Sequence, residues 1–302
     1  MNRPLVSVIL TTYNAEATIA PVVHSILGQE GAGKDFDVEL IVVDDTSTDD
    51  TLNVLANLGV HVLHTGCNTG GPNRGRNIGL EACSGQAICI ADHDDVWEPQ
   101  RLSLTVPHLQ RAPIVTCGYT VYDRVSGKTD RRIADQSLVE YPDGVTFMDK
   151  LARSKTGQNT YLGSILYSAE LVHVQFQEQY GVVDFDWILR LFDGKSSIEV
   201  GHSLYRRNVE RSNLSLDPVY RERDLEVTLA CIASYKRLHP RASRLGTRRA
   251  YGTYARYAYV TGRMPLARKY FLKAGITPLH AAYWITTFVG ATWVRRRFNV
   301  FG

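Results

Sequence analysis

The segment from Ile88 to Pro99 constrains the fold of this chain most, because it joins an apolar run to a cluster of acidic residues. Its first four residues are apolar or small, which predicts a buried strand. Three carboxylates follow within four positions, at Asp92, Asp94 and Asp95. At the carboxyl end of a strand in a parallel α/β sheet, where ligands normally bind, such carboxylates repel one another unless a cation lies among them. The alternative is a solvated turn before a helix that begins near Pro99.

Two earlier apolar runs indicate how this strand is arranged with others. Val6 to Leu10 ends in a polar loop that leads into a helical pattern, and Glu39 to Val43 ends at two aspartates followed by a second helical pattern. Strands that alternate with helices over short links predict a doubly wound sheet, mostly parallel and flanked by helices. We therefore expect an α/β fold in which the loops after Leu10, Val43 and Ala91 open on one edge of the sheet.

The cation that suits the acidic cluster is a hard divalent ion. Mg²⁺ and Mn²⁺ prefer carboxylate oxygens, and they retain open positions that phosphate oxygens occupy. We expect Asp94 and Asp95 to ligate Mn²⁺ or Mg²⁺. The ion would then bind a phosphorylated ligand at the edge of the sheet.

A glycine-rich stretch from Thr65 to Gly79 lies before an expected helix. Its glycines allow the backbone to approach a ligand closely, and Arg74 and Arg76 can hydrogen-bond anionic oxygens in pairs, which suits a diphosphate. The stretch is not a Walker motif, because the spacing and the Lys-Ser/Thr ending are absent. A glycine-rich surface loop without a ligand is the alternative.

Four motifs, taken in order and spacing, resemble the nucleotide-binding half of the family 2 glycosyltransferases that have the GT-A fold. They are VSVILTTYN from Val6 to Asn14, VVDDTSTDDT from Val42 to Thr51, NTGGPNRGRNIG from Asn68 to Gly79, and IADHDDVWEP from Ile90 to Pro99. The resemblance covers about the first 215 residues. It implies a GT-A sheet, mostly parallel but mixed and flanked by helices, and a UDP-, GDP- or dTDP-sugar as the donor.

The same resemblance implies donor-binding positions. Those that match positions holding the nucleotide base are Thr11, Tyr13, Asp45 and Arg76, and those that match the motif binding ribose and a metal-bridged diphosphate are Asp92, Asp94 and Asp95. Family members often carry a histidine after a Tyr-Arg pair near the diphosphate, where this chain has Asn208. We expect Arg206 to contact the diphosphate instead; Arg207 and a solvated basic loop are the alternatives.

The segment from Tyr180 to Trp187 carries the candidate catalytic base. Asp184 and Asp186 lie at the start of a helical pattern, where they would otherwise serve as an N-cap and a first-turn acid. The resemblance implies a base at Asp184; because Val183 replaces the family's neighbouring acid, Asp186 is the alternative. A carboxylate that removes the acceptor's proton while the anomeric carbon is attacked opposite the leaving diphosphate gives inversion. The Gln-x-x-Arg-Trp signature of processive synthases is absent, so one sugar per visit is expected.

The carboxyl-terminal part differs from the rest in charge. From Val227 to Gly302 there are 14 Lys or Arg and no Asp or Glu, whereas the first 226 residues hold 20 basic and 31 acidic residues. We expect a catalytic domain over residues 1–217 and a basic helical extension over 218–302. Leu279 to Val294 is mostly apolar and precedes three arginines; its 16 residues are fewer than the roughly 20 that span a bilayer. It predicts a helix at a membrane surface, with packing on the catalytic domain or a homodimer contact as alternatives.

Together these features predict an inverting, metal-dependent glycosyltransferase. It is expected to move one sugar to a cell-surface glycan or lipid-linked acceptor while bound peripherally to the cytoplasmic face of the cell membrane. Five scattered cysteines without metal-ligand spacing fit a reducing cytoplasm. A nucleotidyltransferase is one alternative, although it would need a glycine-rich loop with a catalytic Lys or Arg after the first strand. A nucleic-acid-binding protein that uses the basic extension is the other; because no recognised module occurs, no nucleic acid partner is expected.

Overall fold

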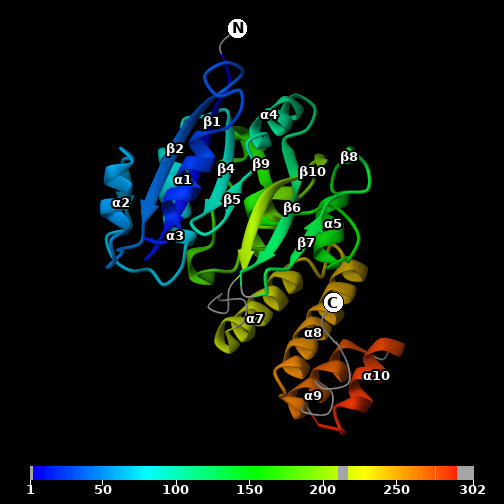
Figure 1. Cartoon of the computed structure of the whole chain (residues 1–302). Helices are drawn as coiled ribbons and strands as arrows, with labels where there is room; N and C mark the ends of the chain where they lie inside the picture. The colour runs from blue at the N-terminus through cyan, green and yellow to red at the C-terminus, as the bar shows by residue number, and fades with distance from the viewer. Residues whose placement is uncertain (1–2, 125, 210–216, 276, 291–302) are drawn as a thin grey trace. The chain divides into compact units, whose positions relative to one another are not determined.

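The computed structural model of the chain describes residues 3–124, 126–209, 217–275 and 277–290. The chain forms two compact units (Figure 1). The sheet unit comprises Met1–Phe147 and Gly157–Asn213, and the helical unit comprises Met148–Thr156 and Leu214–Gly302. The helical unit thus includes a short segment from the middle of the chain as well as the basic extension. The domain boundary after residue 217 stays a prediction.

The described strands of the sheet unit form one mixed sheet of ten strands in the order β3-β2-β1-β4-β9-β6-β10-β5, with β7 beside β6 and β8 beside β10. The pairs β1–β2, β1–β4, β2–β3 and β6–β10 are parallel, whereas β9 runs antiparallel to both β4 and β6. The strands are β1 (Leu5–Thr12), β2 (Asp37–Asp44), β3 (Val62–His64), β4 (Ala87–Asp92), β5 (Val96–Trp97), β6 (Ile114–Asp123), β7 (Thr129–Arg132), β8 (Leu138–Tyr141), β9 (Ile165–Ser168) and β10 (Ser197–Val209). The expected mixed α/β sheet is confirmed.

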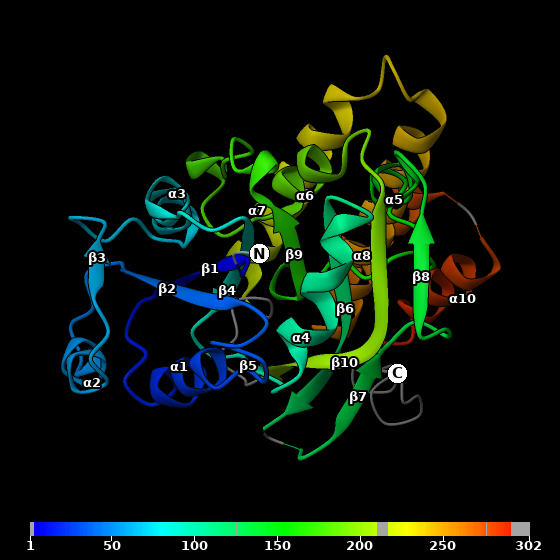
Figure 2. The ribbon, with the colours of Figure 1, turned by 90° about the horizontal axis from the view of Figure 1, so that it is seen from above.

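Helices cover both faces of this sheet. Figure 2 shows α1 (Ile19–Leu27) and α2 (Thr51–Asn57) on one side of β1 and β2, and α3 (Asn73–Ala82) on the other. The apolar face of α1 shares one core cluster with alternate residues of β1. α3 approaches the opposite face so closely that a Cβ atom at Gly79 would clash with Cγ2 of Ile9, which explains the glycine. Also present are α4 (Arg101–Thr105), α5 (Val145–Leu151), α6 (Phe185–Phe192) and the short 3-10 helices η1 (Val106–Gln110), η2 (Leu162–Ser164), η3 (Ala169–Leu171) and η4 (Glu178–Tyr180).

The strand register brings polar residues to one edge of the sheet. Thr11 on β1 is paired with Asp92 on β4, and Thr12 is paired with Asp44 on β2. Because these strands are parallel, their carboxyl ends and the loops that follow them meet at the same edge. This is the edge at which the sequence predicted the donor site.

The helical unit contains α7 (Pro218–Ser234), α8 (Pro240–Val260), α9 (Met264–Ala274) and α10 (Pro278–Thr286). Each of them has a proline in its first turn, where a helix makes no use of the missing N–H group. One core cluster joins small residues to aromatic rings and consists of Ala255, Ala258, Tyr259, Met264, Ala267 and Phe271. The predicted carboxyl-terminal helices are therefore confirmed.

The helix predicted to lie at a membrane surface is shorter than expected in the described residues. α10 ends at Thr286, and the three arginines from Arg295 to Arg297 lie outside the described residues. The hydroxyl groups of Thr286 and Thr287 donate to backbone oxygens one turn earlier, at distances of 3.0 Å and 2.6 Å, which competes with continuation of the helix. In the described ranges, no helix combines the length and the apolar character that a bilayer span requires.

Candidate active site

Asp95 connects the acidic motif to β10. Its Oδ1 atom accepts a 2.8 Å hydrogen bond from the backbone N–H of Asn208, and its Oδ2 atom accepts one from the hydroxyl of Tyr205. The hydroxyl of Tyr161 lies 3.5 Å from the same Oδ2 atom. Asp95 is 2% exposed, and burial, followed by the charges of the neighbouring aspartates, raises the pKa of its carboxyl well above the ordinary value. Both oxygens of this side chain are therefore engaged by other parts of the protein.

The environment of Asp94 differs from that of Asp95. It is half-buried, and the side-chain amide of Asn208 donates a 2.6 Å hydrogen bond to its backbone oxygen rather than to its carboxylate. Burial raises the pKa of the Asp94 carboxyl, the charge of Asp92 raises it further, and His93 and Arg207 lower it. A cation next to this carboxylate would offset both the burial and the like charge. The geometry thus favours Asp94 over Asp95 as a metal ligand.

Arg76 joins the glycine-rich stretch to the acidic motif. From α3, its Nη2 atom donates a 3.0 Å hydrogen bond to Oδ1 of Asp92, and its Nη1 atom donates a 3.1 Å hydrogen bond to Oδ1 of Asn73. Its guanidinium carbon lies 5.1 Å from the centre of the Phe176 ring. The buried Nε atom has no hydrogen-bond partner among the described residues. Arg76, which the resemblance matched to a base-binding position, therefore contacts the acidic motif directly.

The loop after β2 orders the glycine-rich stretch. The Asp45 carboxylate accepts hydrogen bonds from the backbone N–H of Thr69 (3.0 Å), from the hydroxyl of Thr69 (2.9 Å) and from the hydroxyl of Thr65 (2.8 Å). Thr11 is buried at the end of β1, whereas Tyr13 is 41% exposed in the loop that follows. Asp45 therefore shapes the loop, and the exposed ring of Tyr13 offers a surface on which a flat base can stack.

The glycine-rich stretch also contacts the segment that precedes Asp184. A Cβ atom at Gly71 would lie 2.8 Å from the carbonyl carbon of Gly181, so this approach requires glycine. Asn77 on α3 accepts a 2.8 Å hydrogen bond from the N–H of Phe176 and donates a 2.9 Å hydrogen bond to its carbonyl oxygen. These contacts bring the glycine-rich stretch next to the segment that precedes Asp184. In the sequence, only the resemblance to the family connected these two parts of the chain.

Asp184 and Asp186 differ in their contacts. Asp184 is the N-cap residue of α6, and its side chain makes no capping hydrogen bond. Asp186 lies in the first turn and pairs with Arg190 one turn later, with Oδ2 at 2.8 Å from Nε and 2.7 Å from Nη2. Because an ion pair of this spacing stabilises a helix, Asp186 contributes to the first turn of α6. Which of the two aspartates accepts the proton stays a prediction.

Arg206 and Arg207 are neighbours on β10, and successive strand residues point to opposite faces. Arg206 is exposed and is paired with Val96 on β5, whereas Arg207 is half-buried, with its guanidinium carbon 4.9 Å from the centre of the Tyr161 ring. Burial lowers the pKa of Arg207, but Tyr161 and Asp95 raise it, so that it lies above the ordinary value. Of these two arginines, Arg207, which the sequence analysis gave as an alternative, is the one whose charge interacts with Asp95 of the acidic motif. Contact of Arg206 or Arg207 with a diphosphate stays a prediction.

Sequence reasoning assigned no role to two tyrosines of this site. Tyr161 and Tyr205 have rings 5.7 Å apart, and both hydroxyls approach Asp95. Tyr205 directly precedes the arginine pair that the sequence analysis singled out, so its place in the sequence could have indicated a role at the site. Tyr161 lies in a stretch that has no recognisable pattern, and its contact with Asp95 depends on a fold that joins residues 66 positions apart.

The donor set can be compared with the needs of a divalent ion. Among the described residues, no three His, Cys, Asp or Glu side chains are grouped as metal ligands. Mg²⁺, however, is commonly bound through one or two carboxylates together with substrate phosphates and water. A half-buried carboxylate at Asp94, whose pKa is raised by burial and by the charge of Asp92, fits such an ion.

Comparison with known proteins agrees with this architecture. The crystal structure of S. aureus TarS 1-349 superimposes with a TM-score of 0.64 at 16% identity, and the match covers 97% of this chain and 91% of that chain. The mannosyltransferase PcManGT from Pyrobaculum calidifontis, in complex with GDP-Man and Mn²⁺, gives a TM-score of 0.61 at 18% identity, over 95% of this chain and 80% of that chain. At these identities the similarity shows the fold.

Sequence comparison identifies the family. An uncharacterized glycosyltransferase of Haemophilus influenzae is 31% identical over 147 residues, which are 47% of this chain and 57% of that protein. The poly(ribitol-phosphate) beta-N-acetylglucosaminyltransferase TarS of Staphylococcus aureus is 39% identical over 102 residues, 32% of this chain and 17% of TarS. The matches therefore span less than two thirds of either relative. Residues 7–173 match the model of glycosyl transferase family 2, more than half of the chain, and the chain belongs to that family.

Proposed function

We propose that this protein transfers one sugar from a nucleoside-diphosphate sugar to an acceptor hydroxyl, with inversion at the anomeric carbon. The observation that carries the proposal is the meeting of Arg76 and the acidic motif at the carboxyl edge of the parallel strands, where Arg76 bonds Asp92 at 3.0 Å. Cations and carboxylates at such an edge suit a metal-bridged diphosphate. Membership of glycosyl transferase family 2 supports the same reaction.

The donor is proposed to be a UDP-, GDP- or dTDP-sugar. Structures similar to this chain include TarS in complex with UDP-GlcNAc and PcManGT in complex with GDP-Man and Mn²⁺. In this chain the exposed ring of Tyr13 would stack on the base, and Thr11 and Asp45 would line the base side of the site. Asp92 would accept hydrogen bonds from the ribose, because its second carboxylate oxygen is not the one that bonds Arg76.

Mn²⁺ or Mg²⁺ is proposed to bind at Asp94. When bound, such an ion neutralises the charge that develops on the leaving diphosphate. Asp95 would hold the motif in place through Tyr205 and Asn208, with both of its oxygens already hydrogen-bonded. Arg207, next to Tyr161, would add positive charge on the diphosphate side, and the exposed Arg206 would contact it from the rim.

Asp184 is proposed as the catalytic base. It would accept the proton of the acceptor hydroxyl as the oxygen attacks the anomeric carbon, while the bond from that carbon to the diphosphate breaks. Asp186 would stabilise the start of α6 through Arg190. The contacts between the glycine-rich stretch and the segment ending at Gly181 support a base close to the donor.

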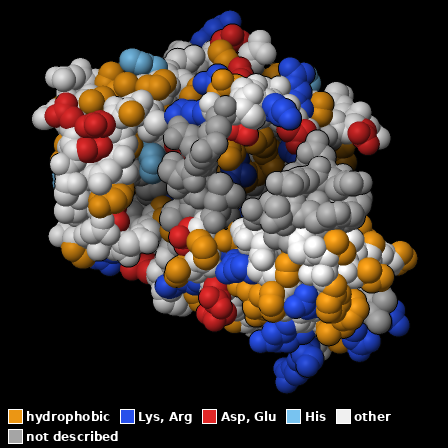
Figure 3. All heavy atoms as spheres, turned by 60° about the horizontal axis from the view of Figure 1, so that its bottom comes forward, with side chains coloured by type: hydrophobic (Ala, Val, Ile, Leu, Met, Phe, Trp, Pro, Cys, Tyr) orange, Lys and Arg blue, Asp and Glu red, His pale blue; other side chains and the backbone are white. Residues whose placement is uncertain are grey.

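The acceptor is proposed to be a cell-surface glycan or a lipid-linked saccharide at the cytoplasmic face of the membrane. TarS is by its name a transferase that acts on poly(ribitol-phosphate), which supports a glycan acceptor. α10 and the turn after it expose apolar side chains at Leu279 (51%), Ile285 (61%) and Phe288 (63%). In the lower part of Figure 3, Lys and Arg side chains lie beside hydrophobic ones, a combination that suits an anionic lipid surface. A homodimer contact through the same side chains is the other outcome of the membrane test described below.

A donor screen tests this function. The full chain would be incubated with UDP-, GDP- and dTDP-sugars and Mn²⁺, and release of the nucleoside diphosphate would be followed. One donor class should be hydrolysed slowly without an acceptor, because water can replace the acceptor hydroxyl. Release of pyrophosphate in the presence of a sugar phosphate and a nucleoside triphosphate, with no donor hydrolysis, would instead indicate a nucleotidyltransferase.

A further inference from the structure

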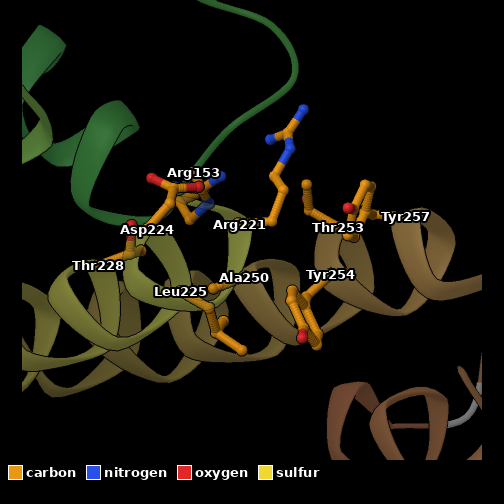
Figure 4. A pocket seen from close by; sticks show the side chains of 9 residues that line it. All are labelled: Arg153, Arg221, Asp224, Leu225, Thr228, Ala250, Thr253, Tyr254 and Tyr257. Atoms are coloured by element: carbon orange, nitrogen blue, oxygen red, sulfur yellow. The ribbon is translucent and has the colours of Figure 1, made fainter. Parts of the chain in front are cut away.

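Figure 4 shows a pocket of the helical unit that is lined by side chains of α7 and α8 and by Arg153. Its cavity volume is about 20 Å³, which is room for about one water molecule and not for a substrate group. The sheet unit contains a more informative arrangement. Residues 174–177, hereafter the bridging segment, belong to no helix or strand, yet side chains of two helices bond all four of their carbonyl oxygens.

The first half of the bridging segment is bonded to α6. The indole Nε1 atom of Trp187 donates a 2.7 Å hydrogen bond to the carbonyl oxygen of Val174. Nη2 of Arg190 donates a 2.8 Å hydrogen bond to the carbonyl oxygen of Gln175. Trp187 is buried, so its N–H group would be left without a partner if this segment moved away. Two side chains of α6 thus fix that helix to the bridging segment.

The second half of the bridging segment is bonded to α3. Asn77 contacts Phe176 in both directions: its Oδ1 atom accepts a 2.8 Å hydrogen bond from the N–H group, and its Nδ2 atom donates a 2.9 Å hydrogen bond to the carbonyl oxygen. One turn earlier, Nδ2 of Asn73 donates a 3.1 Å hydrogen bond to the carbonyl oxygen of Gln177. Because buried backbone groups need partners, these side chains take the place of a neighbouring strand. α3 and α6 are therefore connected through consecutive carbonyl oxygens.

The ring of Phe176 makes a second connection between the two helices. It is stacked on the ring of Trp187, with the centres 4.6 Å apart and the planes inclined by 8°. The guanidinium carbon of Arg76, on α3, lies 5.1 Å from the centre of the same Phe176 ring. Since Arg76 also bonds Asp92, packed side chains run without a break from the acidic motif to α6.

α3 therefore fixes two parts of the proposed site at once. It carries Arg76, and Oδ1 of Asn73 accepts a 3.1 Å hydrogen bond from Nη1 of that arginine while Nδ2 of Asn73 bonds the bridging segment. The bridging segment in turn holds Trp187, which lies in the first turn of α6, three residues after Asp184. A base must lie within hydrogen-bond reach of its proton, and a displacement of about 1 Å can cost about 10²-fold in rate.

We propose that Asn77 is a positioning residue for the sugar transfer and that it sets the place of Asp184 relative to the donor through the bridging segment. The inference rests on the proposed role of Asp184 as the base. The hydrogen bonds of Asn77 go to Phe176 and, at 3.2 Å, to the carboxylate of Glu178, so Asn77 acts through the protein rather than on the reacting atoms.

Asn77→Ala tests this role in the full chain. The variant leaves the N–H and carbonyl groups of Phe176 without their partner, so the bridging segment and the start of α6 should shift. The kcat for release of nucleoside diphosphate from the preferred donor in Mn²⁺, with water as the acceptor, should fall about 10- to 100-fold. The dissociation constant of the donor should stay within about twofold of the wild-type value.

Gln29→Ala is the matched control. Gln29 is 4% exposed and Asn77 is 6% exposed, and Gln29 also joins backbone groups in both directions. Its Oδ1 counterpart, Oε1, accepts a 2.9 Å hydrogen bond from the N–H group of Leu102, and its Nε2 atom donates a 3.0 Å hydrogen bond to the carbonyl oxygen of Glu98. Both variants should lower the melting temperature, but Gln29→Ala should keep kcat within about twofold. If it slows hydrolysis as much as Asn77→Ala does, loss of stability explains the effect and the proposal is wrong.

Two further measurements of kcat separate positioning from packing. Trp187→Phe retains an aromatic ring but removes the bond to Val174, so it should lower kcat in the same direction as Asn77→Ala while donor affinity is retained. If Asn77 acts through Asp184, adding Asn77→Ala to Asp184→Asn should lower kcat by less than about a further twofold. Additive losses would overturn the positioning role and retain the base. Normal turnover by Asp184→Asn alone would overturn both.

Amide hydrogen exchange tests the connection without any turnover. Asn77→Ala should accelerate exchange severalfold at Phe176 and at Ile188, whose N–H group bonds the carbonyl oxygen of Asp184 at 3.0 Å. Gln29→Ala should leave both rates unchanged. Unchanged exchange at Ile188 in Asn77→Ala would show that the bridging segment does not hold the start of α6, and it would overturn the proposal. The expected exchange pattern in a protein that hydrolyses no donor would refute the sugar transfer and retain the connection between α3 and α6.

Discussion

The Nη2 atom of Arg76, on α3, donates a 3.0 Å hydrogen bond to Oδ1 of Asp92, at the end of β4. The two side chains are 5% and 24% exposed, so this ion pair is largely shielded from water. It joins the glycine-rich stretch to the acidic motif through protein side chains. Such a link between the two parts of the proposed diphosphate site reduces the ordering that donor binding requires.

Replacing Arg76 should destabilise the fold as well as weaken donor binding. Arg76→Met retains the aliphatic stem but leaves Asp92 without its partner, and we expect the free energy of unfolding to fall by about 3 kcal/mol. Arg74→Met is the control, because the pair of Arg74 with Glu178 is longer, at 3.4 Å, and both side chains are nearly half exposed. It should cost less than about 1 kcal/mol. Urea unfolding of both variants, with Asp92→Asn to complete a double-mutant cycle, gives the coupling energy; a value near zero would contradict the finding.

Glu39 on β2 should make stability depend on pH. Burial raises its pKa, but hydrogen bonds from Ser7 and Ser84 outweigh that effect and hold it below the ordinary 4.5. Because the folded state favours the ionised form, the contribution of Glu39 to the free energy of unfolding is present above about pH 4.5 and is lost as the pH falls through the lowered value. The free energies of unfolding of the wild type and of Glu39→Gln should therefore differ more at pH 7 than at about pH 3. If the difference in the free energy of unfolding between the wild type and Glu39→Gln grew as the pH fell, the predicted direction of the pH dependence would be wrong.

The arrangement of strands β1, β2 and β4 was accessible from sequence, because each apolar run ends in a polar loop and the periodicity of the next segment is helical. The position of β9 in the sheet was not accessible from sequence. It runs antiparallel between β4 and β6, and nothing in its four residues distinguishes it from a buried piece of helix or loop. Local pattern thus determines which segments are strands, whereas the pairing of β9 depends on packing over the whole sheet.

In the candidate site, too, the local sequence pattern does not determine the contacts of single residues. The sequence places Asp94 and Asp95 side by side and assigns both to a metal. In the fold, Asp95 bonds Tyr205 and Asn208, which lie 110 and 113 residues away, and it is buried. Neighbours on a chain can thus receive different environments from distant segments, and no spacing rule reports this. For the same reason the pattern could not separate Arg206 from Arg207.

Asp184 and Asp186 should respond differently to loss of charge. Asp184→Asn preserves shape but cannot accept a proton, so turnover of donor and acceptor should fall by about 10²- to 10⁴-fold while donor affinity stays near that of the wild type. Asp186→Asn breaks the pair with Arg190 and should cost about 0.5 kcal/mol of stability with turnover retained. Steady-state kinetics and donor titration of both variants measure this. If Asp186→Asn is the variant that loses turnover, the two roles are reversed.

The apolar side chains of α10 should be required for binding to anionic lipid. Leu279 and Ile285 are 51% and 61% exposed, so replacing both with aspartate leaves the core intact while it adds charges that a membrane surface disfavours. Co-sedimentation with phosphatidylglycerol vesicles should fall about tenfold or more. Val219→Asp, at a 76% exposed site on α7, should bind as the wild type does. Unchanged vesicle binding of the double variant, together with a loss of dimer in solution, would assign these side chains to a homodimer contact.

The most direct test of a metal-assisted diphosphate site is the rate of nucleoside diphosphate release from the preferred donor, measured in Mn²⁺ and in EDTA. The account predicts that EDTA abolishes release, that Mn²⁺ or Mg²⁺ restores it, and that Asp94→Asn weakens donor binding in Mn²⁺ because the diphosphate loses its bridge. Full activity of the wild type in EDTA, with Asp94→Asn unimpaired, would contradict it.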